Sequence, residues 1–425
     1  MVEKTILESG LTVISEYRPE LPSLAMSFTL LRGSRHESPV ISGIHHLIEH
    51  MLFKGSEKYD LRAIASLSDR LGGSLNAFTG KELTQYYLKS LDETFPQAFD
   101  LLGDLVTAAT FPREEFRKEI NVVLQEIRES RDNPDTHAFE LFFSRLFPDQ
   151  ALGCPISGEP ERLSRLDRDD VFGFYSETYR PPNLLLAAAG HVNHHDLVRE
   201  AENRFGGFAP ATPADFTTGE PEFAFQTTVH RKPSLEQVYA VIGFAGIPKA
   251  SPLRYRFMLM NEILGAGMSS RLFQKIREDQ GLAYTVSSFG DSYHDCGVQM
   301  VYAVIEPKNI NPYLRAVKHE IEILKREGVG PEELARAKDH LKSSIVLQME
   351  SNLSRMRFHV NQELYHRREI KLSEILEEIN RASREDIHQV LTTHLDLERT
   401  AVLLYGNVPD DTVENLNLAA PADAW

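Results

Sequence analysis

Two histidines and a glutamate within five residues have the spacing of a metal-binding helix. The stretch GIHHLIEHMLFKGS, residues 43–56, places His46 and His50 four positions apart, with Glu49 between them. Side chains four residues apart lie on the same face of an α-helix, so both imidazoles can bind one ion. Glu49 falls beside that face, close enough to reach a water on the ion. The order H-x-x-E-H reverses the H-E-x-x-H of common zinc proteases but supplies the same groups.

A catalytic zinc site also needs a third protein ligand and an open position for water. The segment EEFRKEINVVLQEIRE, residues 114–129, predicts a helix whose apolar side chains form one stripe. Glu119 and Glu126 lie on one edge of this stripe, within about 20° of each other. Carboxylates beside a buried face are costly unless a metal or a cation compensates them. We therefore expect Glu126 to be the third ligand and Glu119 to orient the site or tune its charge.

The alternative is an ordinary amphipathic helix that happens to be rich in histidine. A histidine pair at this spacing often lies on the surface or makes hydrogen bonds within a core. The two carboxylates downstream are what favour the metal site over this alternative. His45 points away from His46, so we expect it to be a half-exposed structural residue and no ligand.

The chain contains an internal repeat that serves as a control for this hypothesis. Residues 43–56 align with YRFMLMNEILGAGMS (255–269), and residues 112–130 align with GPEELARAKDHLKSSIVLQ (330–348). The second copy has Met258, Asn261 and Glu262 over the metal motif, and Ala337 and Ser344 over the two helix carboxylates. The fold alone therefore does not require these polar residues, which favours chemistry in the first half only.

Length and composition indicate a soluble chain of two domains. The 425 residues exceed a typical single core, and 42% hydrophobic and 25% charged residues are ordinary for globular proteins. A stretch rich in Gly, Pro and Thr near the middle is typical of a linker. We predict a catalytic domain over 1–207, a linker over 208–228 and a homologous domain over 229–425. Alternating strands and long helices predict an α+β fold for each.

Charge and cysteine content restrict the partners and the compartment. A formal net charge of −16 disfavours nucleic acid, and it favours basic peptides only where the acidic residues surround a cavity. No apolar run approaches the ~20 residues of a membrane span. Cys154 and Cys296 lie far apart, so no disulfide framework or cysteine zinc site is indicated. The first residues lack the features of a secretory signal or a transit peptide, so we expect a cytoplasmic protein.

These motifs resemble those of the pitrilysin/insulinase family of inverted zincins, in the branch with the mitochondrial processing peptidase β subunit and small bacterial homologues. HLIEHMLFKGS matches the core motif, and Glu126 follows His50 by 76 positions (126 − 50 = 76), the family's spacing for the third ligand. LGGSLNAFTGKELTQYY resembles the family's substrate-pairing edge strand, although TGKEL departs from the usual run. GMSSRLFQKIREDQGLAYTVSS resembles the segment that completes the active site from the second half.

The resemblance implies a zinc-dependent endopeptidase that cuts extended peptides or leader sequences, with one zinc ion per chain. Its metal ligands would be His46, His50 and Glu126. Its catalytic residues would be Glu49, Glu119, Tyr284 and Arg277. Its substrate-binding residues would be Asn76, Ala77, Arg277 and Tyr284.

The resemblance further implies two homologous α+β domains that close like a clam shell around a chamber. It implies a homodimer, or a heterodimer with a related inactive subunit. The alternative function is a non-catalytic scaffold or recognition subunit, a role of family members that have lost the zinc motif. The complete motif of this chain argues against that alternative. A lyase acting on ribosylhomocysteine also carries an H-x-x-E-H helix, but such chains are far shorter and lack a second half.

Overall fold

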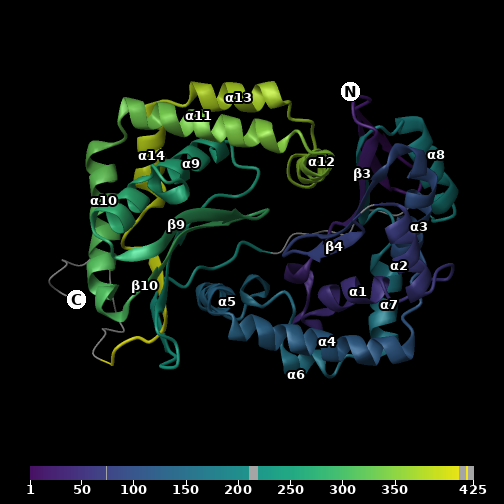
Figure 1. Cartoon of the computed structure of the whole chain (residues 1–425), viewed down its shortest axis with the longest axis horizontal. Helices are drawn as coiled ribbons and strands as arrows, with labels where there is room; N and C mark the ends of the chain where they lie inside the picture. Colours follow the sequence, from purple (N-terminus) through teal and green to yellow (C-terminus); the bar gives the residue numbers. More distant parts are fainter. Residues whose placement is uncertain (73, 210–218, 411–417, 420–425) are drawn as a thin grey trace. The chain divides into compact units, whose positions relative to one another are not determined.

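The chain folds around two β-sheets, one in each of two units (Figure 1). The structure is a computed structural model that describes residues 1–72, 74–209, 219–410 and 418–419. The first unit comprises Met1–Glu129, Cys154–Thr218 and Leu347–Glu369. The second comprises Ser130–Gly153, Gly219–Val346 and Ile370–Trp425. Each unit combines a mixed sheet with helices, so the predicted α+β class is confirmed.

The first sheet has the strand order β1-β2-β6-β3-β5-β4, which leaves β4 at one edge. Its strands are β1 (Val2–Ile6), β2 (Thr12–Tyr17), β3 (Ser23–Leu30), β4 (Asn76–Thr79), β5 (Thr84–Leu91) and β6 (Leu184–Gly190). β2 and β6 are parallel, and the other neighbouring pairs are antiparallel. Every residue of β6 is buried, as expected for an apolar strand covered on both faces.

The second sheet, in the order β7-β11-β8-β10-β9, repeats this topology. Its strands are β7 (Thr227–Arg231), β8 (Val238–Ala245), β9 (Ala283–Ser292), β10 (Gly297–Ile305) and β11 (Thr400–Gly406). The one parallel pair is β7–β11, which corresponds to β2–β6 in the first sheet. The remaining pairs are antiparallel and follow the order β6-β3-β5-β4 of the first sheet. The internal repeat predicted from two short alignments is therefore confirmed by the strand order and directions.

Helices cover both sheets. Those of the first unit are α1 (Ile44–Leu52), α2 (Leu61–Arg70), α3 (Phe95–Thr107), α4 (Arg113–Asp132), α6 (Pro160–Leu163), α7 (Arg168–Thr178), α8 (His194–Phe205) and α12 (Asn352–His366), and α4 ends three residues beyond the unit boundary. Those of the second are α5 (Pro134–Leu146), α9 (Arg254–Asn261), α10 (Ile310–Glu327), α11 (Pro331–Gln348), α13 (Leu372–Arg381) and α14 (Arg384–His394). Two π-helical segments follow α9, at Glu262–Ala266 and Phe273–Asp279. Short 3-10 helices occupy Ser34–His36, Pro39–Ile41, Asp92–Thr94, Ala151–Gly153 and Pro307–Asn309. Among the residues that the structure describes, no helix is long and apolar enough to cross a membrane.

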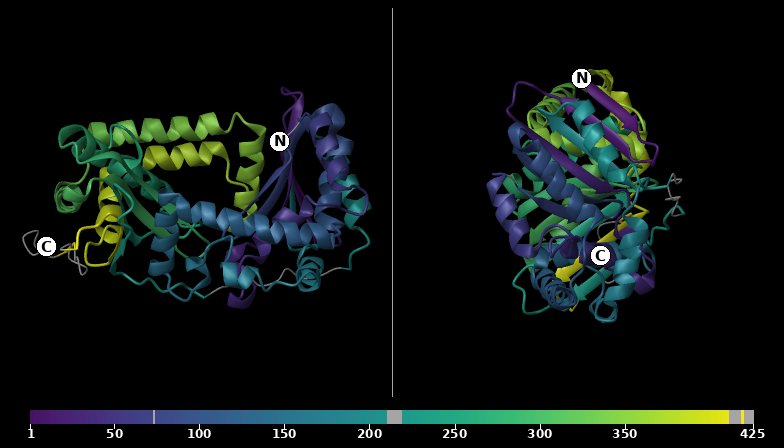
Figure 2. Two further views of the ribbon diagram at one scale, coloured as in Figure 1. Left: turned by 60° about the horizontal axis from the view of Figure 1, so that its bottom comes forward. Right: turned by 90° about the vertical axis from the view of Figure 1, so that its right-hand side faces the viewer.

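Each half of the sequence contributes one helix to the sheet of the other half. α12 comes from the second half but packs on β3 and β6 of the first sheet, on the face opposite α3 and α8 (Figures 1 and 2). Its buried Met356 and Val360 join the apolar side chains of those strands in one cluster. α5 comes from the first half and packs on β8 and β11 of the second sheet. A Cβ on Gly243 would lie 2.2 Å from Cζ of Phe142 on α5, so only glycine permits this close approach.

Polar contacts also fasten α12 to the first sheet. The Glu16 carboxylate on β2 accepts hydrogen bonds from Arg355 and from Nε2 of His359, the latter at 2.9 Å. Burial, the largest influence, raises the pKa of Glu16, but His359, Arg355 and Arg18 outweigh it and lower the pKa below its usual value.

The two units differ from the predicted contiguous ranges 1–207 and 229–425 by the two exchanged helices and the residues around them. Residues 210–218 of the predicted 208–228 linker lie outside the described residues. The assignment of catalytic and completing roles to the two domains stays a prediction.

Candidate metal centre

α1 is the helix predicted around the H-x-x-E-H motif. Its two predicted ligands remain partly exposed. Its buried residues are His45 and the apolar Ile44, Leu47, Ile48, Met51 and Leu52. The helix begins after Gly43, which has a φ of +92° and lies against the backbone of Ser157. A Cβ at Gly43 would lie 2.6 Å from the Ser157 carbonyl oxygen, so glycine is required where this helix starts.

His46, His50 and Glu126 converge on one point. One nitrogen of each imidazole and one oxygen of Glu126 all lie within 4.8 Å of one another, and no other such trio of His, Cys, Asp or Glu occurs among the described residues. The distance to the Glu126 carboxylate is 3.5 Å from His50 Nε2 and 3.9 Å from His46 Nε2. The structure therefore brings together the three predicted ligands.

The donor set and its protonation state fit zinc. Two imidazole nitrogens and one carboxylate oxygen are the ligand set of many catalytic zinc sites, which keep a further position for water. Burial, assisted by the neighbouring His50, lowers the pKa of His46 to about 4, so its ring is neutral at neutral pH. A neutral imidazole is the form that binds a metal. The Glu126 side chain is 42% exposed, so the cluster can be reached from solvent.

Glu119 fixes the orientation of His50. Its Oε2 accepts a hydrogen bond of 3.0 Å from His50 Nδ1, which leaves Nε2 directed towards Glu126. Its Oε1 pairs with the ammonium of Lys54 at 2.7 Å. Burial, the largest influence, raises the pKa of Glu119, but the bonds from His50 and Lys54 lower it below its usual value. These contacts are the ones that the predicted orienting role of Glu119 requires, and the role itself stays a prediction.

Glu49 lies beside the ligands and is held by the edge strand. Oγ1 of Thr79 on β4 donates a hydrogen bond of 2.5 Å to Glu49 Oε2. Burial raises the pKa of Glu49, although the bond from Thr79 and the charge of His50 oppose the rise. A carboxylate with a raised pKa beside a metal-binding cluster has the properties of a general acid and base.

The other predicted substrate residues lie in two places. Asn76 and Ala77 are the first residues of edge strand β4, where Oδ1 of Asn76 accepts a bond from the Ala77 N–H at 2.8 Å. Arg277 and Tyr284 lie in the second unit, where the Arg277 guanidinium stands 4.6 Å from the centre of the Tyr284 ring. Tyr284 is 79% exposed. Substrate binding by these four residues stays a prediction.

The expectation that His45 is half-exposed is wrong. Its side chain is fully buried; Nδ1 pairs with Glu37 at 2.9 Å, and the ring packs edge-on against Phe174. Glu37 also accepts the backbone N–H groups of Gly43 and His45 at the start of α1, so a carboxylate supplies the partners that make this burial possible.

Sequence reasoning missed two residues that contact the site, Lys54 and Thr79. Lys54 follows His50 by four positions, so the helical spacing used for His46 and His50 was a usable signal. Thr79 shares a strand face with Ala77, but nothing in the sequence indicates that this face meets α1.

Comparisons with known proteins identify a family and several similar chains. A family model described as "Insulinase (Peptidase family M16)" matches residues 12–159, and one described as "Peptidase M16 inactive domain" matches residues 165–341. The chain is 34% identical over 414 residues to an uncharacterized zinc protease of Bacillus subtilis, covering 96% of this chain and 100% of the relative. It is 37% identical over 345 residues to an uncharacterized zinc protease of Rickettsia felis, covering 81% of this chain and 83% of the relative.

Solved structures share the fold. A protease from Helicobacter pylori superposes with a TM-score of 0.88 at 20% identity, covering 95% of this chain and 99% of its own. A peptidase M16 inactive domain from Pseudomonas fluorescens gives the same TM-score and identity, and the superposition covers 96% of this chain and 98% of that structure. At this identity the likeness concerns the fold alone.

Proposed function

This chain belongs to the insulinase family, peptidase family M16, and from that premise we propose that it is a zinc-dependent endopeptidase. The observation that carries the proposal is the convergence of His46, His50 and Glu126, with Glu49 on the same helix as the two histidines. The family relatives carry the name zinc protease, which supports zinc as the metal. We propose one zinc ion per chain.

The side chains around the cluster divide the work of peptide hydrolysis. Zinc, when bound by the three ligands, supplies Lewis acidity and lowers the pKa of a bound water towards ~7. Glu49, whose Oε2 accepts a hydrogen bond from Thr79, takes the proton of the attacking water and returns it to the leaving amine. General base catalysis of this kind typically contributes ~10²–10⁴ in rate. Glu119 keeps His50 Nδ1 bonded, so Nε2 stays available as a ligand.

The edge strand and the second unit supply substrate contacts in this proposal. An extended peptide pairs with β4 at Asn76 and Ala77, so backbone hydrogen bonds give affinity and side-chain pockets give selectivity. Arg277 and Tyr284 bind the substrate backbone and steady the oxyanion, a contribution of about 3 kcal/mol for one good donor. Basic peptides are the proposed substrates to the extent that the acidic residues behind the net charge of −16 surround the substrate site. We further propose a cytoplasmic homodimer, for which a solution mass near twice 48.2 kDa is expected.

The alternative function, a non-catalytic scaffold, predicts that residues of the metal motif have been lost. Against this alternative, the three proposed ligands lie within 4.8 Å of one another, Glu119 bonds His50, and Glu49 lies on the same helix as the two histidines. The family model described as an inactive domain matches residues 165–341, and within this range the repeat carries Met258, Asn261 and Glu262 at the positions of the metal motif.

The test compares the wild-type chain with Glu49→Gln on a quenched basic peptide of about ten or more residues. Glutamine has nearly the same shape but cannot take up the proton, so we expect zinc content to be retained and cleavage to be lost. Equal cleavage by both proteins would contradict the role of Glu49. Absence of cleavage by a zinc-loaded wild type on a mixed peptide library would favour the scaffold.

A further inference from the structure

We infer that Lys54 is a positioning residue of the metal centre, which acts on His50 through Glu119. The inference rests on the proposed zinc binding. The contacts form an unbroken chain: Lys54 Nζ lies 2.7 Å from Glu119 Oε1, and Glu119 Oε2 lies 3.0 Å from His50 Nδ1. Nε2 on the opposite side of the same ring belongs to the ligand cluster. Lys54 therefore stands two contacts away from the metal-binding atom.

The burial of Glu119 explains why this carboxylate needs a second partner. Glu119 is 4% exposed, and its two oxygens are divided between His50 and Lys54. Lys54 is the one Lys or Arg that pairs with Glu119 within the described ranges. A carboxylate held at both oxygens cannot turn about its last bond, whereas one held at a single oxygen can. Loss of Lys54 should therefore loosen the bond that fixes the His50 ring.

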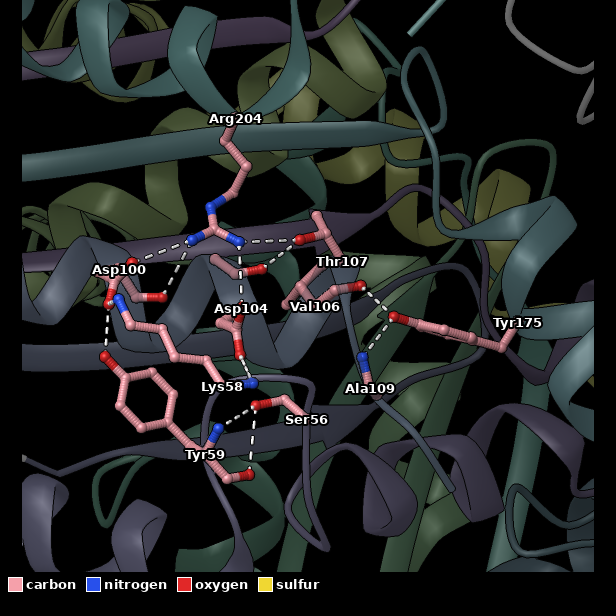
Figure 3. A network of polar contacts seen from close by, with 11 residues as sticks. Ser56, Lys58, Tyr59, Asp100, Asp104, Val106, Thr107, Ala109, Tyr175 and Arg204 are labelled. Atoms are coloured by element: carbon pink, nitrogen blue, oxygen red, sulfur yellow. Dashed lines mark hydrogen bonds and ion pairs between the residues drawn. The ribbon is translucent and has the colours of Figure 1, made fainter. Parts of the chain in front are cut away.

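The loop that carries Lys54 is itself held in place. The Lys54 N–H donates to the Met51 carbonyl at the end of α1, and the Gly55 carbonyl accepts the Thr110 N–H at 3.0 Å. Beyond Gly55, a polar network joins residues 56–59 to α3 and α8 (Figure 3). In it, the Asp100 carboxylate accepts bonds from Lys58, from Tyr59 and from Arg204. Lys54 thus extends from a fixed backbone, as a positioning residue must.

Two effects of removing Lys54 on zinc affinity have opposite signs. Simple electrostatics predicts tighter binding, because a nearby cation repels a divalent cation. The positioning role predicts weaker binding, because partners of a metal-bound histidine's second nitrogen typically change metal affinity 10–100-fold. Lys54 contacts Glu119 and not the histidine itself, so we expect zinc affinity to fall about tenfold, at the lower end of this range. The sign of the change therefore separates the two effects.

The experiment measures the zinc dissociation constant of the full chain by competition with a chromophoric chelator. We expect Lys54→Met to weaken binding about tenfold and Lys54→Arg, which keeps a cationic donor, to restore most of it. Lys58→Met is the matched control: it also removes a cation from the same loop, but Tyr59 and Arg204 still hold Asp100. We expect zinc affinity within about twofold of wild type for this control. An unchanged or tighter constant for Lys54→Met would overturn the inference.

A double-mutant cycle separates positioning from a general effect on the fold. If Lys54 acts through Glu119, adding Lys54→Met to Glu119→Gln should change zinc affinity by less than twofold. Additive losses would overturn the inference, and Lys54→Gln gives a second variant if Lys54→Met is unstable. Because the readout is binding, a wild type that binds zinc but cleaves no peptide would contradict the proposed catalysis while leaving this comparison intact. A wild type that binds no zinc would contradict both.

Discussion

The contact between Thr79 and Glu49 predicts that a hydroxyl on the edge strand controls the catalytic base. Thr79→Val removes that hydroxyl and keeps the branched shape of the side chain. Valine also favours strands, so β4 should still form. Because Thr79 contacts Glu49 and none of the three ligands, zinc affinity should stay within about twofold of wild type.

The expected magnitude follows from the kind of bond that is lost. A hydrogen bond to a charged group is worth roughly 1.5–3 kcal/mol. Glu49 can still reach the attacking water without Thr79, but it samples other orientations, so we expect about half of this energy to appear in the barrier. At about 1.4 kcal/mol per tenfold change in rate, kcat/KM should fall roughly 3- to 12-fold.

The assay is kcat/KM on a quenched peptide, with zinc content measured on the same preparations. Thr79→Ser, which keeps the hydroxyl, should retain more activity than Thr79→Val. Wild-type activity in Thr79→Val would refute the proposed control of the base. Equal losses in both variants would show that the methyl group matters and the hydrogen bond does not.

Three further perturbations test the site and the exchanged helices. Glu126→Gln removes the anionic ligand, so metal analysis after dialysis should find zinc reduced from about one ion per chain to almost none; full retention would exclude Glu126 as a ligand. Glu16→Gln keeps one carbonyl oxygen as an acceptor but removes the negative charge that pairs with Arg355 and His359, so urea unfolding at pH 7 should show a loss of about 2–3 kcal/mol in the free energy of unfolding. Because the folded pKa of Glu16 is lowered from 4.5, its stabilisation exists above that value and disappears as the pH falls through the folded pKa, so the stabilities of the two proteins should converge at acidic pH below 4.5. Gly243→Ala forces a methyl group against Phe142 and should cost about 1–3 kcal/mol in thermal unfolding; a neutral result would contradict the close packing of α5.

Local patterns were sufficient to predict the elements that carry the metal centre. Helical spacing places His46 and His50 on one face, and the apolar stripe of residues 114–129 predicts α4 with Glu126 along its edge. Both patterns depend only on the 3.6-residue turn, which the sequence alone determines. The uninterrupted apolar run of β6 is likewise typical of a buried strand, because a strand covered on both faces has no polar side.

Contacts between distant segments were not predictable in this way. The exchange of α5 and α12 depends on which sheet each helix packs against, and an amphipathic pattern shows only that a helix has an apolar face. The burial of His45 depends on Glu37, a residue of the preceding loop whose partner no spacing rule indicates. The bond from Thr79 to Glu49 joins strand β4 to helix α1. The sequence pattern of each element does not show that the two elements lie side by side.

The exchange of α5 and α12 also has a consequence for folding during synthesis. The first sheet can form early, but the face that α12 covers stays open until the ribosome has made residues 352–366. Until then the sheet exposes an apolar surface that includes Ile14, Ala25 and Leu185. Such a surface favours association with other chains or with chaperones. From the completion of β6 at residue 190 until residues 352–366 emerge, in the last fifth of its synthesis, the nascent chain should therefore stay aggregation-prone.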